Sequence, residues 1–333
     1  MLRPLVVLVA IVLAVGVVIG VGYRNMHGAA TEPATSTSLP SPAPSHSRDG
    51  YLNPAVGGNT KSLSPRQSTS WAAQLHETRN YYDFIAKAAK AAYDGDGRAA
   101  YYVFTTMMKC GEFQREYRGA ENPDAQFNID ESTRKLPQWI YDRDRDLFNR
   151  CRGLIKGDPF AQLPKRTDGY PMTYWRAQAL VDGDELAIAN RAGESLAAGV
   201  NAKSDDLRNT LVSNAQNDLN EVVSSRDPEV LFLVGMLLAD GRRSPDPSRG
   251  FAMALAACDL GYDCSSTNPD NVFSVCKDSG ACPADADFAF YLQQMVGAPQ
   301  FAQIYAKAQD FKSLLATGNS ASIAQFIGIH QKL

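Results

Sequence analysis

The chain has 333 residues, of which 44% are hydrophobic, and a formal net charge of −3 at pH 7. A chain of this length has room for about two domains of ordinary size. No basic stripe stands out along it, so the electrostatic signature of a nucleic-acid-binding protein is missing. Nucleic acid is therefore not expected as a partner.

The N-terminal segment contains an uncharged run over residues 4–23, bounded by Arg3 and Arg24. About 20 apolar residues are enough to cross the hydrocarbon core of a membrane as a helix. We therefore expect a membrane anchor over residues 1–27, with a transmembrane helix at 4–23. The alternative is a cleaved signal peptide, whose apolar region is usually shorter and ends at a small-residue site. Here the only such site, around Ala29, follows several polar residues.

Residues 28–70 are rich in Pro, Ser, Thr, Gly and Ala and poor in large apolar side chains. Such a composition buries too little apolar surface to offset the entropy lost on ordering. We expect a disordered linker, with prolines at 33, 40, 42 and 44 that favour extended backbone. It would hold the following domain away from the membrane.

From Trp71 onward, apolar residues recur at the three- and four-residue intervals of amphipathic helices. No alternating run is long enough to predict a strand, so we expect an all-α domain over residues 71–333. Glycines are expected to end the first two helices, Gly95 the first and Gly111 the second. The predicted helices cover residues 82–95, 99–108, 136–152, 172–181, 184–198, 205–225, 227–239, 247–259, 284–296, 298–316 and 320–329.

Three stretches between predicted helices resemble one another, at residues 93–100, 181–188 and 224–231. Each ends one helix and places an aspartate where it can cap the next, at Asp96, Asp184 and Asp227. The distance along the chain from Asp96 to Asp184 is close to two units of about 44 residues, and that from Asp184 to Asp227 is close to one unit. A period of this length is typical of stacked helix pairs.

The segment 227–261 resembles a Sel1-like repeat, a relative of the tetratricopeptide repeat. The matching positions are Gly235, Gly241, Asp246, Ala257 and Gly261. The segment departs from the family in a loop one residue short, in Gly250 for alanine, in Met253 for a large aromatic residue and in Cys258 for alanine. The resemblance implies stacked helical hairpins forming a degenerate α-solenoid, with a concave surface for binding proteins.

The six cysteines all follow the predicted membrane segment, and their number is even. This pattern favours disulfides and an oxidising compartment, although buried free thiols are an alternative. We expect a bridge between Cys110 and Cys151, closing a loop of about 40 residues and worth roughly 3 to 4 kcal/mol. The other four cysteines allow three connectivities, and their spacing is too wide for a typical zinc site. They are Cys258, Cys264, Cys276 and Cys282.

These features predict a single-pass protein of the inner membrane, with its C-terminal domain in the periplasm of a Gram-negative cell. The four histidines, at positions 27, 46, 76 and 330, lie outside the central helices. That leaves no obvious base for a serine or cysteine nucleophile, so an enzyme of this kind, a cofactor and a metal are not expected.

The function expected from the sequence is binding or scaffolding of another envelope protein or peptide. The candidate binding residues are an aromatic cluster in the first hairpin and two arginines in the loop of the repeat. They are Tyr81, Tyr82, Tyr101, Tyr102, Arg242 and Arg243. One alternative is a cell-wall glycan hydrolase that uses two carboxylates, drawn from Glu185, Glu194, Asp205, Asp206 and Glu221. Another is a purely structural envelope component.

Overall fold

A computed structural model describes residues 70–116, 138–240, 246–265, 268 and 286–327. Every regular element in these residues is a helix, so the described part of the chain is all-α. The predicted anchor and linker lie outside the described residues, as do Arg242, Arg243, Cys276 and Cys282. Among the helices that are described, none is both long and apolar enough to cross a membrane.

The described helices follow the predicted ones closely. Their bounds are α2 Trp71–Glu77, α3 Tyr81–Tyr93, α4 Gly97–Glu116, α6 Gln138–Cys151, α7 Gly153–Lys156, α8 Met172–Val181, α9 Glu185–Val200, α10 Asp205–Val222, α11 Pro228–Ala239, α12 Pro247–Asp259, α14 Phe288–Val296, α15 Ala298–Thr317 and α16 Ser320–Ile327. One prediction is wrong, because α4 continues through Gly111. The helical backbone continues through Gly111, and apart from that backbone no atom of the described residues crowds the place where a Cβ would stand.

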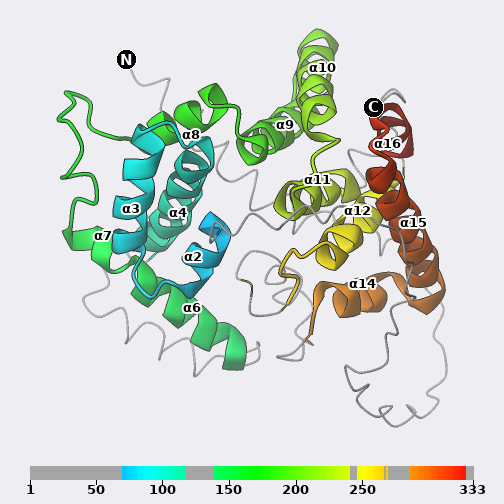
Figure 1. The fold of residues 1–333 in the computed structure, drawn as a ribbon, viewed down its shortest axis with the longest axis horizontal. Helices are drawn as coiled ribbons and strands as arrows, with labels where there is room; N and C mark the ends of the chain where they lie inside the picture. The colour runs from blue at the N-terminus through cyan, green and yellow to red at the C-terminus, as the bar shows by residue number, and fades with distance from the viewer. Residues whose placement is uncertain (1–69, 117–137, 241–245, 266–267, 269–285, 328–333) are drawn as a thin grey trace, which may run out of the picture.

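Neighbouring helices pack in succession along the chain. Helix α3 packs on α4, α4 on α8, α9 on α10 and α11, α11 on α12, and α12 on α15. In the view of Figure 1, α2 to α8 form one group and α11 to α16 a second, with α9 and α10 between them. A single hydrophobic core nevertheless runs from Leu75 in α2 to Ile327 in α16.

Three of the helices begin at the aspartates that the sequence analysis selects. The side chains of Asp96, Asp184 and Asp227 accept hydrogen bonds from the backbone N–H groups of Ala99, Ala187 and Glu229, at 2.9, 3.0 and 2.9 Å. Each bond satisfies a donor that the first turn of a helix leaves unpaired. These caps fix where α4, α9 and α11 begin.

The backbones of α11 and α12 approach each other at two glycines. A Cβ on Gly235 would stand 2.7 Å from the amide nitrogen of Ala254, and one on Gly250 would stand 2.5 Å from the carbonyl oxygen of Gly235. Neither position has room for a side chain, because the obstructing atoms belong to backbone. The Sel1-like family favours alanine at position 250. In this chain a methyl group there would clash with the backbone of α11, which explains the glycine.

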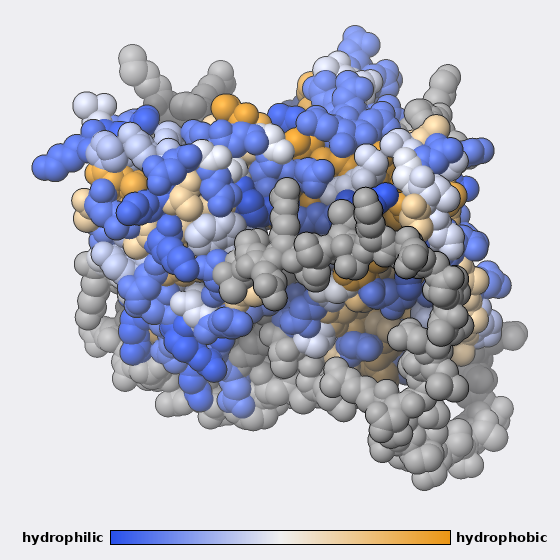
Figure 2. All heavy atoms as spheres, in the orientation of Figure 1, coloured by the Kyte–Doolittle hydropathy of each residue, from blue (hydrophilic) through white to orange (hydrophobic). Residues whose placement is uncertain are grey.

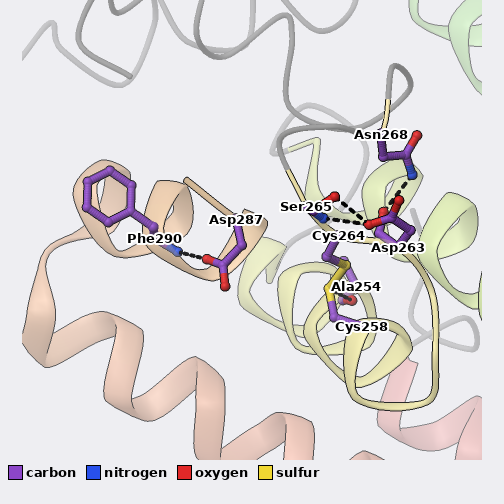
Figure 3. The surroundings of a disulfide bond; sticks show 8 residues. All are labelled: Ala254, Cys258, Asp263, Cys264, Ser265, Asn268, Asp287 and Phe290. Carbon is purple, nitrogen blue, oxygen red and sulfur yellow. Dashed lines mark hydrogen bonds between the residues drawn. A yellow bond between two sulfur atoms is a disulfide. The ribbon is translucent and has the colours of Figure 1, made fainter. Parts of the chain in front are cut away.

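Two disulfides lie within the described residues. One joins Cys110 in α4 to Cys151 at the end of α6, the pairing expected from the sequence, with a Cα–Cα distance of 5.4 Å. The other joins Cys258 in α12 to Cys264, with a Cα–Cα distance of 5.5 Å. Figure 3 shows this bridge at the end of α12. The carbonyl oxygen of Cys264 accepts a hydrogen bond from the Phe288 N–H at 3.0 Å, which ties the start of α14 to the bridge.

Candidate interaction site

The starts of α4, α9 and α11 meet at a set of polar side chains that we call the Arg98 junction: Arg98, Tyr102, Asp184, Asp227 and Glu229. The guanidinium group of Arg98 donates to Asp184 at 2.5 Å and to Asp227 at 2.6 Å. It also lies 3.5 Å from Glu229, which accepts a hydrogen bond from the Tyr102 hydroxyl at 2.5 Å. Two of the three capping aspartates thus share one arginine.

Burial shapes the ionisation of the Arg98 junction. Desolvation disfavours the charge of Arg98, but the carboxylates of Asp184 and Asp227 outweigh it, and the pKa of Arg98 is raised above its ordinary range. Burial and the negative charge of Glu229 together raise the pKa of Tyr102 well above its usual value. At neutral pH the arginine is therefore charged and the phenol protonated, so this arrangement acts to hold three helices together.

Two of the four aromatic residues predicted to bind a partner lie inside the fold. Tyr81 and Tyr102 are 1% and 7% exposed, so both are core residues, whereas Tyr82 and Tyr101 are partly exposed. The ring of Tyr101 packs edge-on against that of Tyr102 at 5.8 Å. The hydroxyl of Tyr82 donates to the carbonyl oxygen of Asp158 at 3.1 Å and so braces a loop.

That loop, residues 157–171, leads from α7 to α8 and is fixed by several contacts. The side chain of Leu163 is buried in the core, and the Tyr170 hydroxyl donates to the Pro164 carbonyl at 2.7 Å. Gly169 has a positive φ of 63°, a backbone conformation that residues other than glycine rarely adopt. The Gln162 side-chain amide donates to the Ala86 carbonyl of α3 at 2.5 Å. The loop is thus held in one conformation against α3.

The loop and the first turn of α8 carry a cluster that we call the aromatic site: Phe160, Arg166, Tyr170, Tyr174 and Trp175. Trp175 lies at its centre, with the ring centroids of Phe160, Tyr170 and Tyr174 at 5.4, 5.4 and 4.9 Å. The guanidinium of Arg166 lies 4.6 Å from the centroid of Tyr174, within range of a cation–π interaction. Phe160, Tyr170 and Tyr174 are partly exposed, and Arg166 is exposed.

The polar groups of the aromatic site bond to neighbouring groups of the loop. Arg166 forms two hydrogen bonds of 3.2 Å with Asp168, which raise the pKa of Arg166 and lower that of Asp168. Burial among the rings, with Tyr93 nearby, raises the pKa of Tyr170. Both charges and the phenol proton are therefore present at neutral pH.

The indole N–H of Trp175 is fully buried and has no acceptor within the described part of the chain. Most buried donors in proteins are paired, and an unpaired one costs about 1 to 3 kcal/mol. The Trp175 ring itself packs against the partly exposed rings of the aromatic site.

The carboxylates of the hydrolase alternative lie on α9 and α10 and have separate partners. Glu185 accepts from the Ser225 hydroxyl at 2.6 Å, and Asp205 pairs with Arg208 at 2.8 Å. Glu194 pairs with Arg176, and burial raises its pKa. Asp206 and Glu221 are exposed. In the described residues no group of three or more His, Cys, Asp or Glu side chains is placed to hold a metal.

Sequence reasoning missed the aromatic site, although a signal is present. Three aromatic residues, Tyr170, Tyr174 and Trp175, fall within six positions where a loop enters a helix. Figure 2 shows that hydrophilic side chains cover most of the described surface on the face in view, with hydrophobic ones in small separate patches. A cluster of partly exposed rings is therefore the more informative feature.

No family model, no curated protein and no solved structure matches this chain.

Proposed function

We propose that the chain is a single-pass protein of the inner membrane, anchored by residues 4–23 and tethered by residues 28–70. Its all-α domain would stand in the periplasm and bind another envelope protein or peptide without catalysis. The uncharged N-terminal run supports the anchor. The two disulfides support an oxidising compartment.

We also propose that the domain is a degenerate Sel1-like α-solenoid. The pairs α9 with α10 and α11 with α12 follow each other along the chain, and α9 packs on α11. The Arg98 junction brings the starts of α4, α9 and α11 together, as side-by-side helices of successive repeats require. Such stacks are used mainly as binding surfaces.

The observation that carries the binding function is the aromatic site on its fixed loop. Partly exposed tyrosine rings held by a rigid scaffold lose little entropy when a partner binds, and aromatic residues and arginine dominate the energetics of protein interfaces. The exposed guanidinium of Arg166 adds N–H donors beside the rings. A protein or peptide surface with apolar side chains and carbonyl acceptors fits this site best.

The test is a pulldown from crosslinked cell envelopes with the full chain as bait. We expect the combined variant Arg166→Ser, Tyr174→Ser to lose at least 80% of the partner that the wild-type chain recovers. The matched control is Tyr305→Ser, which removes a tyrosine that is 41% exposed on α15 and should change recovery little. Equal recovery by wild type and the site variant would refute the assignment of this surface.

One observation favours the hydrolase alternative. Burial raises the pKa of Glu194, as is required of the general acid in a glycan hydrolase. A zymogram with the purified chain and the variant Glu194→Gln tests it. Clearing of cell wall by the wild-type chain and not by the variant would establish catalysis and displace our proposal.

A further inference from the structure

The aromatic site has the chemical character of a surface that binds proline-rich peptides. Such peptides form an extended polyproline helix without internal hydrogen bonds, and proteins bind them on exposed aromatic rings. The site offers the partly exposed rings of Phe160, Tyr170 and Tyr174 together with the exposed guanidinium of Arg166. A bound peptide would present to them proline rings and unpaired carbonyl oxygens.

A proline-rich segment is present in this same chain. Residues 38–45 read Ser-Leu-Pro-Ser-Pro-Ala-Pro-Ser. With three residues per turn, Leu39 and Pro42 fall on one edge of a polyproline helix, and Pro40 and Ala43 on the adjoining edge. Together they form an apolar face, and the segment has no charged residue.

The segment is also within reach of the aromatic site. The first described helix begins at Trp71, whose ring packs on Phe84 of α3 at 6.0 Å, and the 157–171 loop is bonded to the carbonyl of Ala86 in the same helix. Helix α3 has 13 residues and spans about 20 Å. About 25 residues separate the segment from Trp71, and a flexible chain of that length has a typical end-to-end distance of about 25 to 30 Å.

We propose that residues 38–45 bind the aromatic site of their own chain when no other ligand occupies it. This inference rests on the proposed function, because it makes the linker a competitor of the partner. The effective concentration of a segment tethered at this distance is on the order of 1 mM, so even a weak contact would be populated. Binding would also remove about 25 residues of slack from the linker and draw the domain toward the membrane.

The experiment places the photo-reactive residue p-benzoylphenylalanine at Ala43 of the full chain in phospholipid nanodiscs. After irradiation and proteolysis, mass spectrometry should find Ala43 linked mainly to the peptide that contains Tyr170 and Tyr174. The combined variant Pro40→Ala, Pro42→Ala, Pro44→Ala and the single variant Tyr174→Ser should each lower the yield at least fivefold. The thermal unfolding of each variant should match that of the wild-type chain.

Two controls keep the result specific. The same probe at Val56, elsewhere in the linker, should give at most one fifth of the yield, and equal yield would overturn the proposal. Mixing isotopically heavy and light chains separates the sources of the segment. Links formed mainly between heavy and light chains would assign the site to a second copy and overturn binding within one chain.

The outcome also separates this inference from the proposed function. If Ala43 gives no link to the site while the pulldown still depends on Tyr174, the linker proposal fails and partner binding stands. If neither the link nor the pulldown depends on Tyr174, both fail. An added synthetic peptide of sequence 38–45, carrying p-benzoylphenylalanine in place of Ala43, should label the proline-to-alanine chain more strongly than the wild-type chain on irradiation, because the variant's aromatic site is vacant.

Discussion

The Arg98 junction and the contact between α11 and α12 join helices by opposite means. At the junction, one arginine offsets the charges of carboxylates from two other helices. Between α11 and α12, Gly235 and Gly250 bring the two backbones together. The first contact depends on a correct set of charges, whereas the second depends on the absence of side-chain volume.

Removing the charge at the junction should have the largest effect. Arg98→Met leaves the buried carboxylate of Asp184 and the partly buried ones of Asp227 and Glu229 without this cation, so the free energy of unfolding should fall by about 3 to 5 kcal/mol. Urea denaturation of the wild-type chain and the variant at pH 7 measures this change in the free energy of unfolding. The control Arg208→Met, in an exposed pair with Asp205, should cost less than about 1 kcal/mol.

The second largest effect is expected from adding a methyl group where the backbones of α11 and α12 approach each other. Gly250→Ala pushes a Cβ against the backbone of α11 and should cost about 2 to 3 kcal/mol, even though alanine favours the helix. Gly199→Ala in α9 is the matched control, because its Cβ would stand 3.5 Å from the nearest atom, Val212 Cγ2. That variant should be neutral or more stable, and equal losses in the two variants would contradict the close approach.

A smaller effect is expected from Tyr102→Phe, which removes the hydrogen bond to Glu229 at the junction. The loss at pH 7 should be about 1 to 2 kcal/mol. Because the folded pKa of Tyr102 is raised, its contribution is present below the unfolded value of about 10 and is lost as pH rises above it. The wild-type chain should therefore lose more stability than the variant between pH 9 and 11.

The smallest effect concerns Asp246, the cap of α12. Desolvation opposes its charge, but hydrogen bonds from Ser248 and Lys307 outweigh this and lower its pKa. That contribution is present above the unfolded pKa of about 3.9 and is lost as pH falls through the lower folded value. Asp246→Asn keeps a capping oxygen, so it should cost under about 1 kcal/mol at pH 7 and flatten the decline below pH 4.

The sequence predicts those structural features that depend on residues only a few positions apart, such as helix caps and amphipathic helices. The caps Asp96, Asp184 and Asp227 and the apolar periodicity predicted most of the helices and their order. The stop at Gly111 was predicted wrongly, since a glycine ends a helix only when the backbone turns there. The pairing of Cys110 with Cys151 was expected because these two remain once the four cysteines between 258 and 282 are set aside, and the structure contains this bridge.

The aromatic residues show why the site itself was harder to predict. Tyr81 and Tyr102 lie on the buried faces of their helices, while Tyr170 and Tyr174 stand on a loop and a first turn that leave one side open. The residue types are the same in both places. Only the packing of α3 on α4 and of the loop on α3 separates core rings from surface rings.

The sequence by itself determined the helical class, the starts of the main helices and the uncharged N-terminal run, because each depends on neighbours within a few positions. The tertiary structure alone decided that Arg98 meets Asp184 and Asp227, and that Gly250 faces the backbone of α11. These contacts join residues far apart in the chain. Their partners depend on how whole helices pack, which no local pattern specifies.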